Sequence, residues 1–259
     1  MLWKLRSKTF LLDKPIWMGI VNVTPDSFSD GGQFFEPTLA VEQALQLIKN
    51  GAGIIDLGGE STRPGSDGIS AAEELRRVLP VLRQLREYQP DIPISVDTTK
   101  AEVAAEVLAV GVDIINDVSG LSDPEMLSVL KKTGAGYCLM HTQGTPRTMQ
   151  NNPQYEDVVA EVFAFLKDRR EMMIDFGIAP EAIAVDPGLG FGKTLEHNWQ
   201  LVEGIAHFHR LGAPLLVGHS RKRFIAERFA DREAGTRQVS QQLIASGVHI
   251  LRVHEVLEP

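Results

Sequence analysis

The sequence predicts an α/β fold, a closed (β/α)8 barrel formed by a single domain that spans residues 1–259. Eight short apolar runs of the β type recur along the chain, and segments with the 3.6-residue periodicity of amphipathic helices separate them. No shift in composition divides the chain, and its 43% hydrophobic content is enough for one large core. Such alternation over about 250 residues matches the barrel, and an open doubly wound sheet is the alternative.

The predicted strands are short apolar runs that end at polar residues. In chain order they are Ile16–Val23, Gly53–Leu57, Ile92–Val96, Asp113–Asn116, Gly136–Met140, Ile183–Val185, Pro214–Gly218 and His249–Val253. After the last of them only Glu255–Pro259 remain, which are too few residues for a covering helix. We therefore expect the eighth helix of the barrel to be missing or truncated.

The predicted helices are amphipathic and have recognisable starts. Two of them place apolar residues on one face, namely Val41, Ala44, Leu45 and Ile48 in the first and Leu75, Val78, Leu79 and Leu82 in the second. Capping boxes, in which a Ser or Thr and a Glu three residues later satisfy each other's backbone donors, are predicted at Ser70–Glu73, Thr99–Glu102 and Ser122–Glu125. Each of these helices would follow a strand end.

Composition and charge exclude several classes of protein. The single cysteine, Cys138, excludes a disulfide framework and a cysteine metal cluster, and it favours a reducing compartment. The first ten residues lack the apolar core of a signal peptide, and no run of about 18 apolar residues occurs, so we expect a cytoplasmic protein without a membrane partner. The net charge of −8 argues against nucleic acid as a partner, so an anionic substrate would need a local cationic cluster.

Polar residues gather where the predicted strands end, which in a barrel is the face formed by the βα loops. They are Asn22, Asp56, Asp97, Asn116, His141, Asp186, Arg252 and His254, together with the run Gly218–Lys222. Each alone has an ordinary explanation, such as a helix cap for Asp97 or a satisfied strand-end residue for His141. These explanations do not account for the whole set, in which carboxylates, an amide, a lysine, an arginine and a histidine from different strands meet at one face of the barrel, here called the mouth.

The segment Asp186–Lys193 is the most distinctive strand end, because glycines follow its carboxylate at positions 188, 190 and 192. They leave little side-chain bulk, so a flat ligand could lie against the backbone while Asp186 meets its polar edge. A Walker loop would need glycine at Pro187, and a dinucleotide fingerprint would need glycine at Lys193, so neither phosphate-binding pattern is present. A plain glycine-rich connection is the alternative.

Several motifs follow one another in a single order between Trp17 and Val256. They are Asn22–Gly32, Gly58–Gly65, Ser95–Thr98, Met140–Gly144, Asp186–Lys193, Ser220–Lys222 and Arg252–His254. Through these motifs the chain resembles the dihydropteroate synthases of bacterial folate biosynthesis. The resemblance implies a transferase that joins 6-hydroxymethyl-7,8-dihydropterin diphosphate to p-aminobenzoate, giving 7,8-dihydropteroate and pyrophosphate, with Mg2+ as the cofactor and a homodimer as the assembly.

A pterin pocket follows from the resemblance and agrees with the chemistry of the residues. A pterin presents a guanidine-like edge, and a carboxylate, here Asp186 by resemblance, can accept two parallel N–H bonds from it. Asp97 and Asn116 would reach other ring nitrogens, and Lys222 the ring carbonyl or N5. The remaining pocket residues are Asp56, Met140 and Gly218. The residues expected to be catalytic are Asp97, Lys222, Arg252 and His254.

The leaving group and the arylamine are expected beside the pterin. In a closed barrel the eighth strand neighbours the first, so Asn22 should lie near Arg252 and His254, which share one strand face. With Arg63 these residues suit pyrophosphate, and Asn22 can supply an oxygen to Mg2+. The p-aminobenzoate residues implied by the resemblance are Phe28, Thr62, Arg63, Pro64, Phe191 and Ser220. Pyrophosphate would depart first, and the arylamine would then attack the pterin methylene.

Three features depart from the family pattern. Glu255 stands where Asp usually follows the histidine, Arg237–Gln242 is more polar than the expected alanine-rich helix, and the last helix is absent. The last two concern helices that form the dimer interface in relatives, so they weaken the expectation of a homodimer. Val239, Leu243 and Ile244 still form one apolar stripe.

Two other functions fit part of the pattern. A methyltetrahydrofolate-dependent corrinoid methyltransferase would share Asp97, Asn116 and Asp186, but it would not need Ser220–Lys222. A non-catalytic pterin-binding barrel would not need the pyrophosphate residues, which are present in this sequence.

Overall fold

The strands that form the barrel agree with the predicted runs to within two residues. They are β3 (Ile16–Asn22), β4 (Ile54–Gly58), β5 (Ile94–Asp97), β6 (Ile114–Asp117), β7 (Gly136–Met140), β8 (Ile183–Asp186), β9 (Leu216–Gly218) and β10 (Ile250–Val253). The computed structural model describes residues 1–24, 37–63 and 65–256. Most strand residues are buried, since helices cover the outside and side chains fill the inside, which explains the continuous apolar runs.

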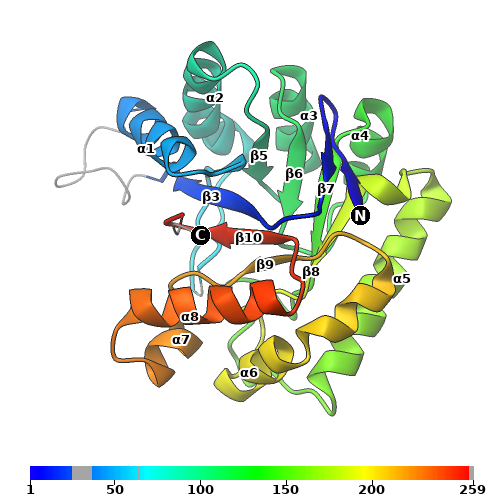
Figure 1. Cartoon of the computed structure of the whole chain (residues 1–259). Coiled ribbons are helices and arrows are strands. Elements are labelled where there is room, and N and C mark those ends of the chain that lie inside the picture. The colour runs from blue at the N-terminus through cyan, green and yellow to red at the C-terminus, as the bar shows by residue number, and fades with distance from the viewer. Residues whose placement is uncertain (25–36, 64, 257–259) are drawn as a thin grey trace.

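The parallel strands roll into a barrel that closes on itself (Figure 1). Their order is β8–β7–β6–β5–β4–β3–β10–β9, so the first and the last strand of the chain's barrel are neighbours. The two ends of this sheet meet at a parallel bridge between Val185 and Leu215. There the Val185 amide donates to the carbonyl of Pro214 at 2.8 Å. The predicted closed barrel is therefore confirmed over the open sheet.

The helices surround this barrel. They are α1 (Pro37–Lys49), α2 (Ala71–Tyr88), α3 (Ala101–Ala109), α4 (Glu125–Thr133), α5 (Val158–Phe176), α6 (Leu195–Glu203), α7 (Arg223–Arg228) and α8 (Arg232–Ala245), with 3-10 helices at Pro180–Ala182 and Ile205–Leu211. Between β10 and Val256, where the described part of the chain ends, no helix occurs. No helix of the described residues is long and apolar enough to cross a membrane.

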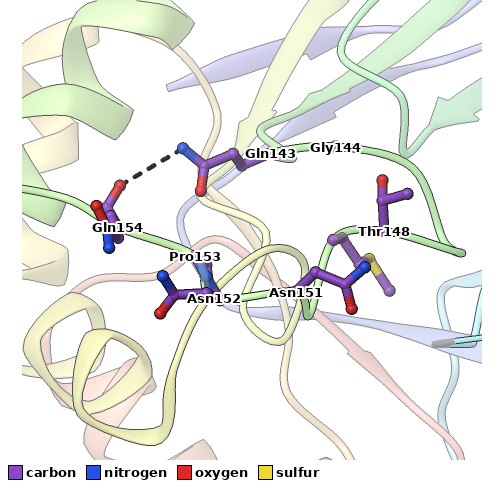
Figure 2. A pocket seen from close by; sticks show the side chains of 8 residues that line it. Gln143, Gly144, Thr148, Asn151, Asn152, Pro153 and Gln154 are labelled. Carbon is purple, nitrogen blue, oxygen red and sulfur yellow. Dashed lines mark hydrogen bonds between the residues drawn. The ribbon is translucent and has the colours of Figure 1, made fainter.

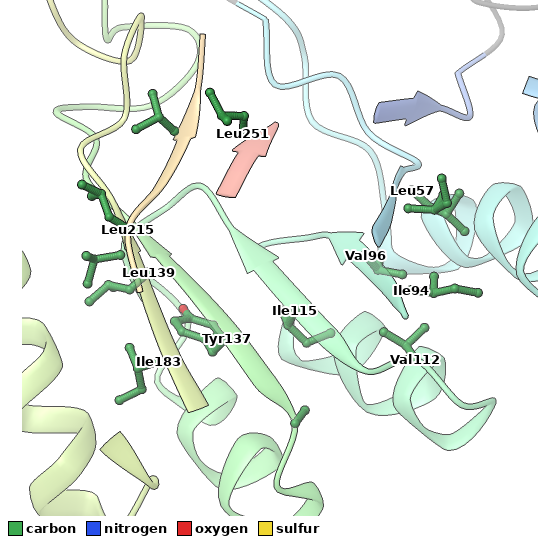
Figure 3. Close-up of a cluster of buried hydrophobic side chains, with 14 of the residues drawn as sticks. Leu57, Ile94, Val96, Val112, Ile115, Tyr137, Leu139, Ile183, Leu215 and Leu251 are labelled. Atoms are coloured by element: carbon green, nitrogen blue, oxygen red, sulfur yellow. The ribbon is translucent and has the colours of Figure 1, made fainter. Parts of the chain in front are cut away.

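The main core lies between the barrel wall and the helices (Figure 3). Leu57, Val96, Ile115, Leu139 and Leu251 come from five different strands, and all are fully buried. Each such side chain contributes about 1.5–3 kcal/mol relative to exposure to water, so this layer supplies most of the stability of the fold.

The polar residues of α8 lie on two faces. Arg237, Gln238, Gln241 and Gln242 are exposed. Thr236 and Ser240 are buried beside the apolar residues Val239 and Leu243. The hydroxyl of Ser240 lies 2.7 Å from Nε2 of His219, so this buried hydroxyl has a partner.

At only one of the three predicted capping boxes does the predicted Ser or Thr side chain cap the helix. Ser70 accepts a hydrogen bond from the Glu73 amide at 3.2 Å where α2 begins. The predictions at Thr99–Glu102 and Ser122–Glu125 are wrong, because Asp123 caps both helices instead. Its carboxylate accepts from the first amide of α3 at 2.9 Å and from the first amide of α4 at 3.0 Å. A full negative charge between two helix N-termini is a stronger cap than either local hydroxyl.

The bottom of the barrel is covered by an N-terminal hairpin that the sequence did not predict. Its strands β1 (Leu2–Lys4) and β2 (Thr9–Leu11) are antiparallel. Trp3 is fully buried against a second apolar cluster that includes Met18, Ile54, Ile114, Ala184 and Ile250. Its indole nitrogen donates to the carbonyl of Ala182 at 3.1 Å. The hairpin thus closes the end of the barrel opposite to the polar strand ends.

Removal of this plug should destabilise the fold. Trp3→Ala should lower the free energy of unfolding by about 3–5 kcal/mol, because it leaves a cavity beneath the barrel. Leu2→Ala is the matched control, since Leu2 precedes Trp3 in the same strand but is 51% exposed, and it should cost less than about 0.5 kcal/mol. Urea unfolding monitored by circular dichroism measures both changes. Equal losses in the two variants would contradict the role of Trp3.

Candidate active site

Arg252 of β10 lies at the centre of a charged cluster inside the barrel, at the end where the strands terminate. Its Nε donates to Asp56 of β4 at 2.6 Å, and its Nη2 donates to Asp97 of β5 at 2.8 Å. The side-chain amide of Asn116 on β6 donates to the same Asp56 oxygen at 3.1 Å. Four strands therefore supply one hydrogen-bonded cluster, which unites residues up to 196 positions apart in the sequence.

The cluster has buried acceptors beyond those that Arg252 engages. One carboxylate oxygen of Asp56 and one of Asp97 are buried and accept no hydrogen bond within the described part of the chain. Burial raises the pKa of Asp97 to about 7, an effect that Arg252 opposes and that Asp56 and Glu74 reinforce. Burial disfavours the charge of Arg252, but Asp56 and Asp97 outweigh it and raise its pKa. Two buried oxygens can therefore accept hydrogen bonds from donors on a ligand.

Asp186 and Lys222 extend the cluster at the ends of β8 and β9. One oxygen of Asp186 accepts the Gly188 amide at 2.7 Å. Burial raises the pKa of Asp186, and Lys222 opposes the rise. Burial lowers the pKa of Lys222 to about 8, and Asp186 opposes the fall. The Lys222 ammonium donates to the carbonyl of Leu189 and lies 4.5 Å from the centre of the Phe191 ring.

Two glycines keep space beside these charges. A Cβ on Gly218 would lie 3.8 Å from an Asp186 oxygen and 3.8 Å from Arg252 carbons, so its absence leaves room between them. Gly188 has a φ of 70°, and a Cβ there would collide with the carbonyl oxygen of His141. The turn after Asp186 therefore requires glycine for both conformation and space.

A buried pair beneath this turn has no counterpart among the predicted site residues. The Lys193 ammonium lies 2.9 Å from Nδ1 of His141 and donates to the carbonyl of Phe191 at 2.9 Å. Burial lowers the pKa of His141 to about 3, so the ring is neutral at pH 7 and Nδ1 can accept from the Lys193 amine. Burial, and then the charge of Lys222, also lower the pKa of Lys193. A lysine directly after a glycine-rich turn was the only sequence signal for this contact.

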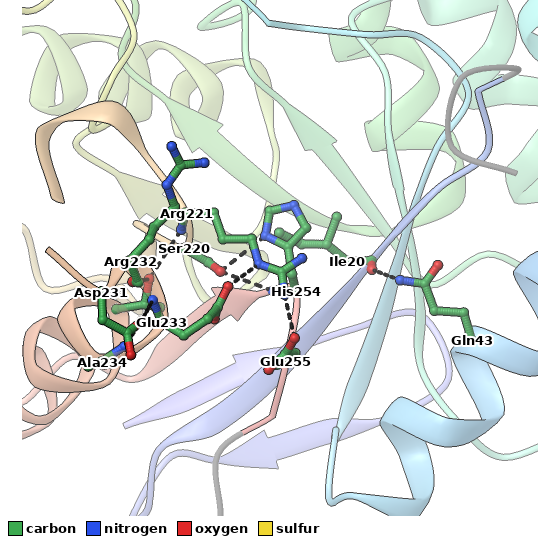
Figure 4. Close-up of polar contacts among 11 residues, drawn as sticks. Ile20, Gln43, Ser220, Arg221, Asp231, Arg232, Glu233, Ala234, His254 and Glu255 are labelled. Atoms are coloured by element: carbon green, nitrogen blue, oxygen red, sulfur yellow. Dashed lines mark hydrogen bonds and ion pairs between the residues drawn. The ribbon is translucent and has the colours of Figure 1, made fainter. Parts of the chain in front are cut away.

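Ser220 and His254 meet at the ends of β9 and β10 (Figure 4). Nδ1 of His254 lies 3.0 Å from the Ser220 hydroxyl, which also accepts the His254 amide at 3.3 Å. Burial and then Arg252 lower the pKa of His254 to about 4, so its ring is neutral at pH 7. Among the described hydrogen bonds no carboxylate orients this histidine, so the pair lacks the third group of a catalytic triad.

Glu255, which departs from the family pattern, is ion-paired. Arg221 donates to Glu255 and to Glu233 of α8, the latter at 2.6 Å (Figure 4). Glu255 therefore supplies a carboxylate that joins the loop after β9 to the segment after β10, while Glu233 joins the same loop to α8.

The other predicted residues lie around the same mouth. Oδ1 of Asn22 and Cβ of Asp97 both approach the side-chain position of Gly58, at 3.7 and 3.8 Å, so strands β3, β4 and β5 bring these residues together. Met140 is buried, Thr62 is half-buried and Arg63 is exposed. The charge of Arg63 contributes to the lowered pKa of His254, which places the two near each other. Phe28 and Pro64 lie outside the described residues.

A hollow of about 420 Å³ is lined by residues of the loop after β7, none of which belongs to the Arg252 cluster (Figure 2). Its lining consists of Gln143, Gly144, Thr148, Met149, Asn151, Asn152, Pro153 and Gln154, none of which is charged. Gln150 of the same loop donates to the carbonyl of Gly190 at 2.8 Å, so this loop supports the glycine-rich turn. The charged groups that acid–base or phosphate chemistry requires are in the Arg252 cluster, which we therefore take as the candidate active site.

Comparisons with known proteins identify the family. The family model for pterin binding enzymes matches residues 18–254. The dihydropteroate synthase of Escherichia coli (strain K12) is 46% identical over 251 residues, which cover 95% of this chain and 89% of that protein.

Solved structures agree with this match. The Xanthomonas albilineans dihydropteroate synthase with 4-aminobenzoic acid has a TM-score of 0.91 at 41% identity and covers 99% of this chain and 94% of that chain. The structure from the same organism in complex with 7,8-dihydropteroate has a TM-score of 0.88 at 38% identity, with coverage of 99% and 94%. This chain therefore belongs to the pterin binding enzyme family and, within it, to the dihydropteroate synthases.

Proposed function

We propose that this chain condenses 6-hydroxymethyl-7,8-dihydropterin diphosphate with p-aminobenzoate, forming 7,8-dihydropteroate and releasing pyrophosphate. The observation that carries the proposal is the cluster of buried carboxylates and cations around Arg252 at the barrel mouth. Relatives whose structures hold 4-aminobenzoic acid or 7,8-dihydropteroate support the arylamine and the product. The corrinoid methyltransferase is disfavoured, because the E. coli relative that matches 95% of this chain is a dihydropteroate synthase.

The ring is proposed to bind between Asp186 and the Asp97–Asn116 pair. Asp186 would accept two N–H bonds from the guanidine-like edge, which is the strongest directional contact available to a buried carboxylate. One buried oxygen of Asp56 and one of Asp97 accept no hydrogen bond from the described residues, and these oxygens suit further ring donors. Lys222, with a pKa lowered to about 8, remains mostly charged at pH 7 and would donate to a ring acceptor. Analogues that lack these polar edges would leave buried groups unpaired and would be rejected.

The diphosphate is proposed to bind between Arg252, His254 and Asn22. Asp56 and Asp97 hold the guanidinium through Nε and Nη2, so its orientation is fixed before a ligand arrives. Its remaining N–H donors can reach phosphate oxygens. His254 is neutral at pH 7 and would contribute a hydrogen bond rather than a charge. Fixed donors of this kind stabilise the negative charge that develops on the departing pyrophosphate.

Mg2+ fits this part of the site as an ion held mainly by the diphosphate and water. Within the described ranges no group of three or more His, Cys, Asp or Glu side chains is arranged as a metal cage. Mg2+ needs only one or two protein oxygens when phosphate and water complete its shell, and Asn22 offers an amide oxygen at the mouth. When bound, the ion would neutralise charge on the leaving group.

The reaction is proposed to proceed by departure of pyrophosphate from the pterin methylene, followed by attack of the arylamine nitrogen. The electron-rich ring stabilises the intermediate cation, so no side-chain nucleophile is needed. The new C–N bond replaces the C–O bond, and one N–H proton of the arylamine is lost. The residues proposed to position the arylamine are Thr62, Arg63, Phe191 and Ser220, together with Phe28 and Pro64.

Assembly as a homodimer, implied by the resemblance, stays a prediction.

An assay of pyrophosphate release tests the proposed function. Release should require the pterin diphosphate, p-aminobenzoate and Mg2+ together, with one 7,8-dihydropteroate formed per pyrophosphate. Omission of each component in turn provides the controls. Methyl transfer from methyltetrahydrofolate to a corrinoid protein, without pyrophosphate release, would support the alternative function instead.

Loss of the Asp186 charge should weaken pterin binding. Asp186→Asn keeps an oxygen that can accept from the Gly188 amide, but it removes the carboxylate that accepts two ring N–H groups. We expect a loss of about 2–5 kcal/mol in binding free energy, as for one partner of a buried charge-assisted pair. Calorimetry with a non-reactive pterin measures it. An unchanged dissociation constant would remove Asp186 from the ring pocket.

Variants of Arg252 and His254 should behave differently. His254→Ala should lower kcat while the affinity for a pterin without its diphosphate stays within about twofold, because the residue faces only the leaving group. Arg252→Ala should lower kcat and also the affinity for this pterin, since it leaves Asp56 and Asp97 buried without their cation. Turnover and calorimetry on the two variants separate these effects. Loss of pterin affinity in His254→Ala would place the histidine in the ring pocket.

A further inference from the structure

The loop between β4 and α2, which carries Thr62 and Arg63, closes on itself. The Ser66 hydroxyl lies within donating distance of two carbonyls, that of Ser61 at 2.6 Å and that of Arg63 at 2.8 Å. The Ser66 amide also donates to the Arg63 carbonyl at 3.0 Å. Residues 61–63 and Ser66, the described residues of this segment joined by these bonds, therefore form a compact unit, and its orientation depends on where it is attached to the rest of the protein.

The unit is attached near its tip and at its base. Near the tip, the Gly65 amide donates to the carbonyl of Pro146 at 2.9 Å. At the base, one Glu60 oxygen accepts the Ile69 amide at 2.8 Å, and the other accepts from the Lys100 ammonium at 2.7 Å. A second contact near the tip, the ion pair between Arg147 and Asp67 at 3.6 Å, is highly exposed and therefore weak. We therefore expect the Glu60 contacts to set the orientation of the unit.

Lys100 is a fixed anchor for Glu60. Its ammonium also donates to Glu74 of α2 at 2.6 Å, and the Glu74 side chain is fully buried. A buried carboxylate depends on its cation, so the Glu74 contact holds Lys100 in place. Burial disfavours the charge of Lys100, but hydrogen bonds to Glu60 and Glu74 outweigh this and raise its pKa, so it stays charged at neutral pH. Lys100 also lies directly beyond the end of β5, where Asp97 belongs to the Arg252 cluster.

We propose that Glu60 is a positioning residue for the arylamine: its ion pair with Lys100 orients the loop unit that carries Thr62 and Arg63 and joins that unit to the strand end that carries Asp97. This inference rests on the proposed function, which assigns p-aminobenzoate to the loop. Glu60 itself touches neither substrate in this account, because its two oxygens are engaged by Ile69 and Lys100. The side chains of Glu60 and Lys100 are only 15% and 26% exposed, so solvent and salt screen their pair less than a surface pair.

Glu60→Gln tests the inference without breaking the anchor. The glutamine oxygen can still accept from Ile69, and the Lys100–Glu74 pair is untouched, so the fold should be retained. We expect the KM for p-aminobenzoate to rise on the order of tenfold, equivalent to about 1.4 kcal/mol. The KM for the pterin diphosphate and kcat at saturation should stay within about twofold, because an interaction lost equally in ground and transition state changes only the KM. Lys100→Met would leave Glu74 unpaired and is expected to unfold the chain.

Glu171→Gln is the control. Glu171 pairs with Lys167 of the same helix, α5, at 3.8 Å, and no described hydrogen bond joins this pair to the loop unit. The same substitution there should leave both KM values unchanged.

The remaining outcomes decide against the proposal. An unchanged KM for p-aminobenzoate in Glu60→Gln would overturn it. An equal rise in both KM values, or a lowered melting temperature together with weaker pterin binding, would make Glu60 a structural residue instead. Absence of pyrophosphate release in the wild type would contradict the proposed function itself, whereas an active wild type with an insensitive Glu60→Gln variant would contradict only this inference.

Discussion

The site depends on one buried guanidinium held between two buried carboxylates. Arg252, Asp56 and Asp97 come from three strands, and none of the three charges is stable inside the barrel without the others. The pairing requires that β10, β4 and β5 end at the same level, which the closed parallel barrel provides. Asn116 donates to the same Asp56 oxygen, and Arg252 opposes the rise that burial causes in the pKa of Asp97.

One end of the barrel stabilises the fold, and the other end carries the polar groups of the candidate active site. The lower end is closed by an apolar plug, in which Trp3 packs beneath the strands. The upper end holds buried polar atoms that have no partner in the described chain, among them an oxygen of Asp56, of Asp97 and of Glu74. Such atoms cost about 1–3 kcal/mol each. The apolar layer between strands and helices offsets this cost, so a reactive mouth and a stable fold coexist in one domain.

The sequence predicted the parts of the structure that depend on local pattern. The apolar runs located the strands because each barrel strand is buried on both faces, and polar residues at their ends located the mouth. Contacts between distant residues could not be predicted. From the sequence we expected Arg252 to lie near Asn22 and the leaving group, and Asp56 and Asp97 to lie around the ring. In the structure Arg252 donates hydrogen bonds to both of these carboxylates. Asp123 replaced two local caps because it lies between two helix starts. The hairpin was missed because its strands have only three residues each.

The Arg252 cluster, and not the uncharged hollow lined by the loop after β7, is proposed to bind the pterin and its diphosphate. A crystal structure of the protein with 6-hydroxymethyl-7,8-dihydropterin diphosphate distinguishes the two sites. We expect Asp186 to accept from the guanidine-like edge of the ring, Asn116 and Asp97 to contact other ring nitrogens, and the diphosphate to lie against Arg252 and His254. A ligand bound in the hollow lined by Gln143 and Gln154, with Asp186 and Arg252 free of contact, would contradict it.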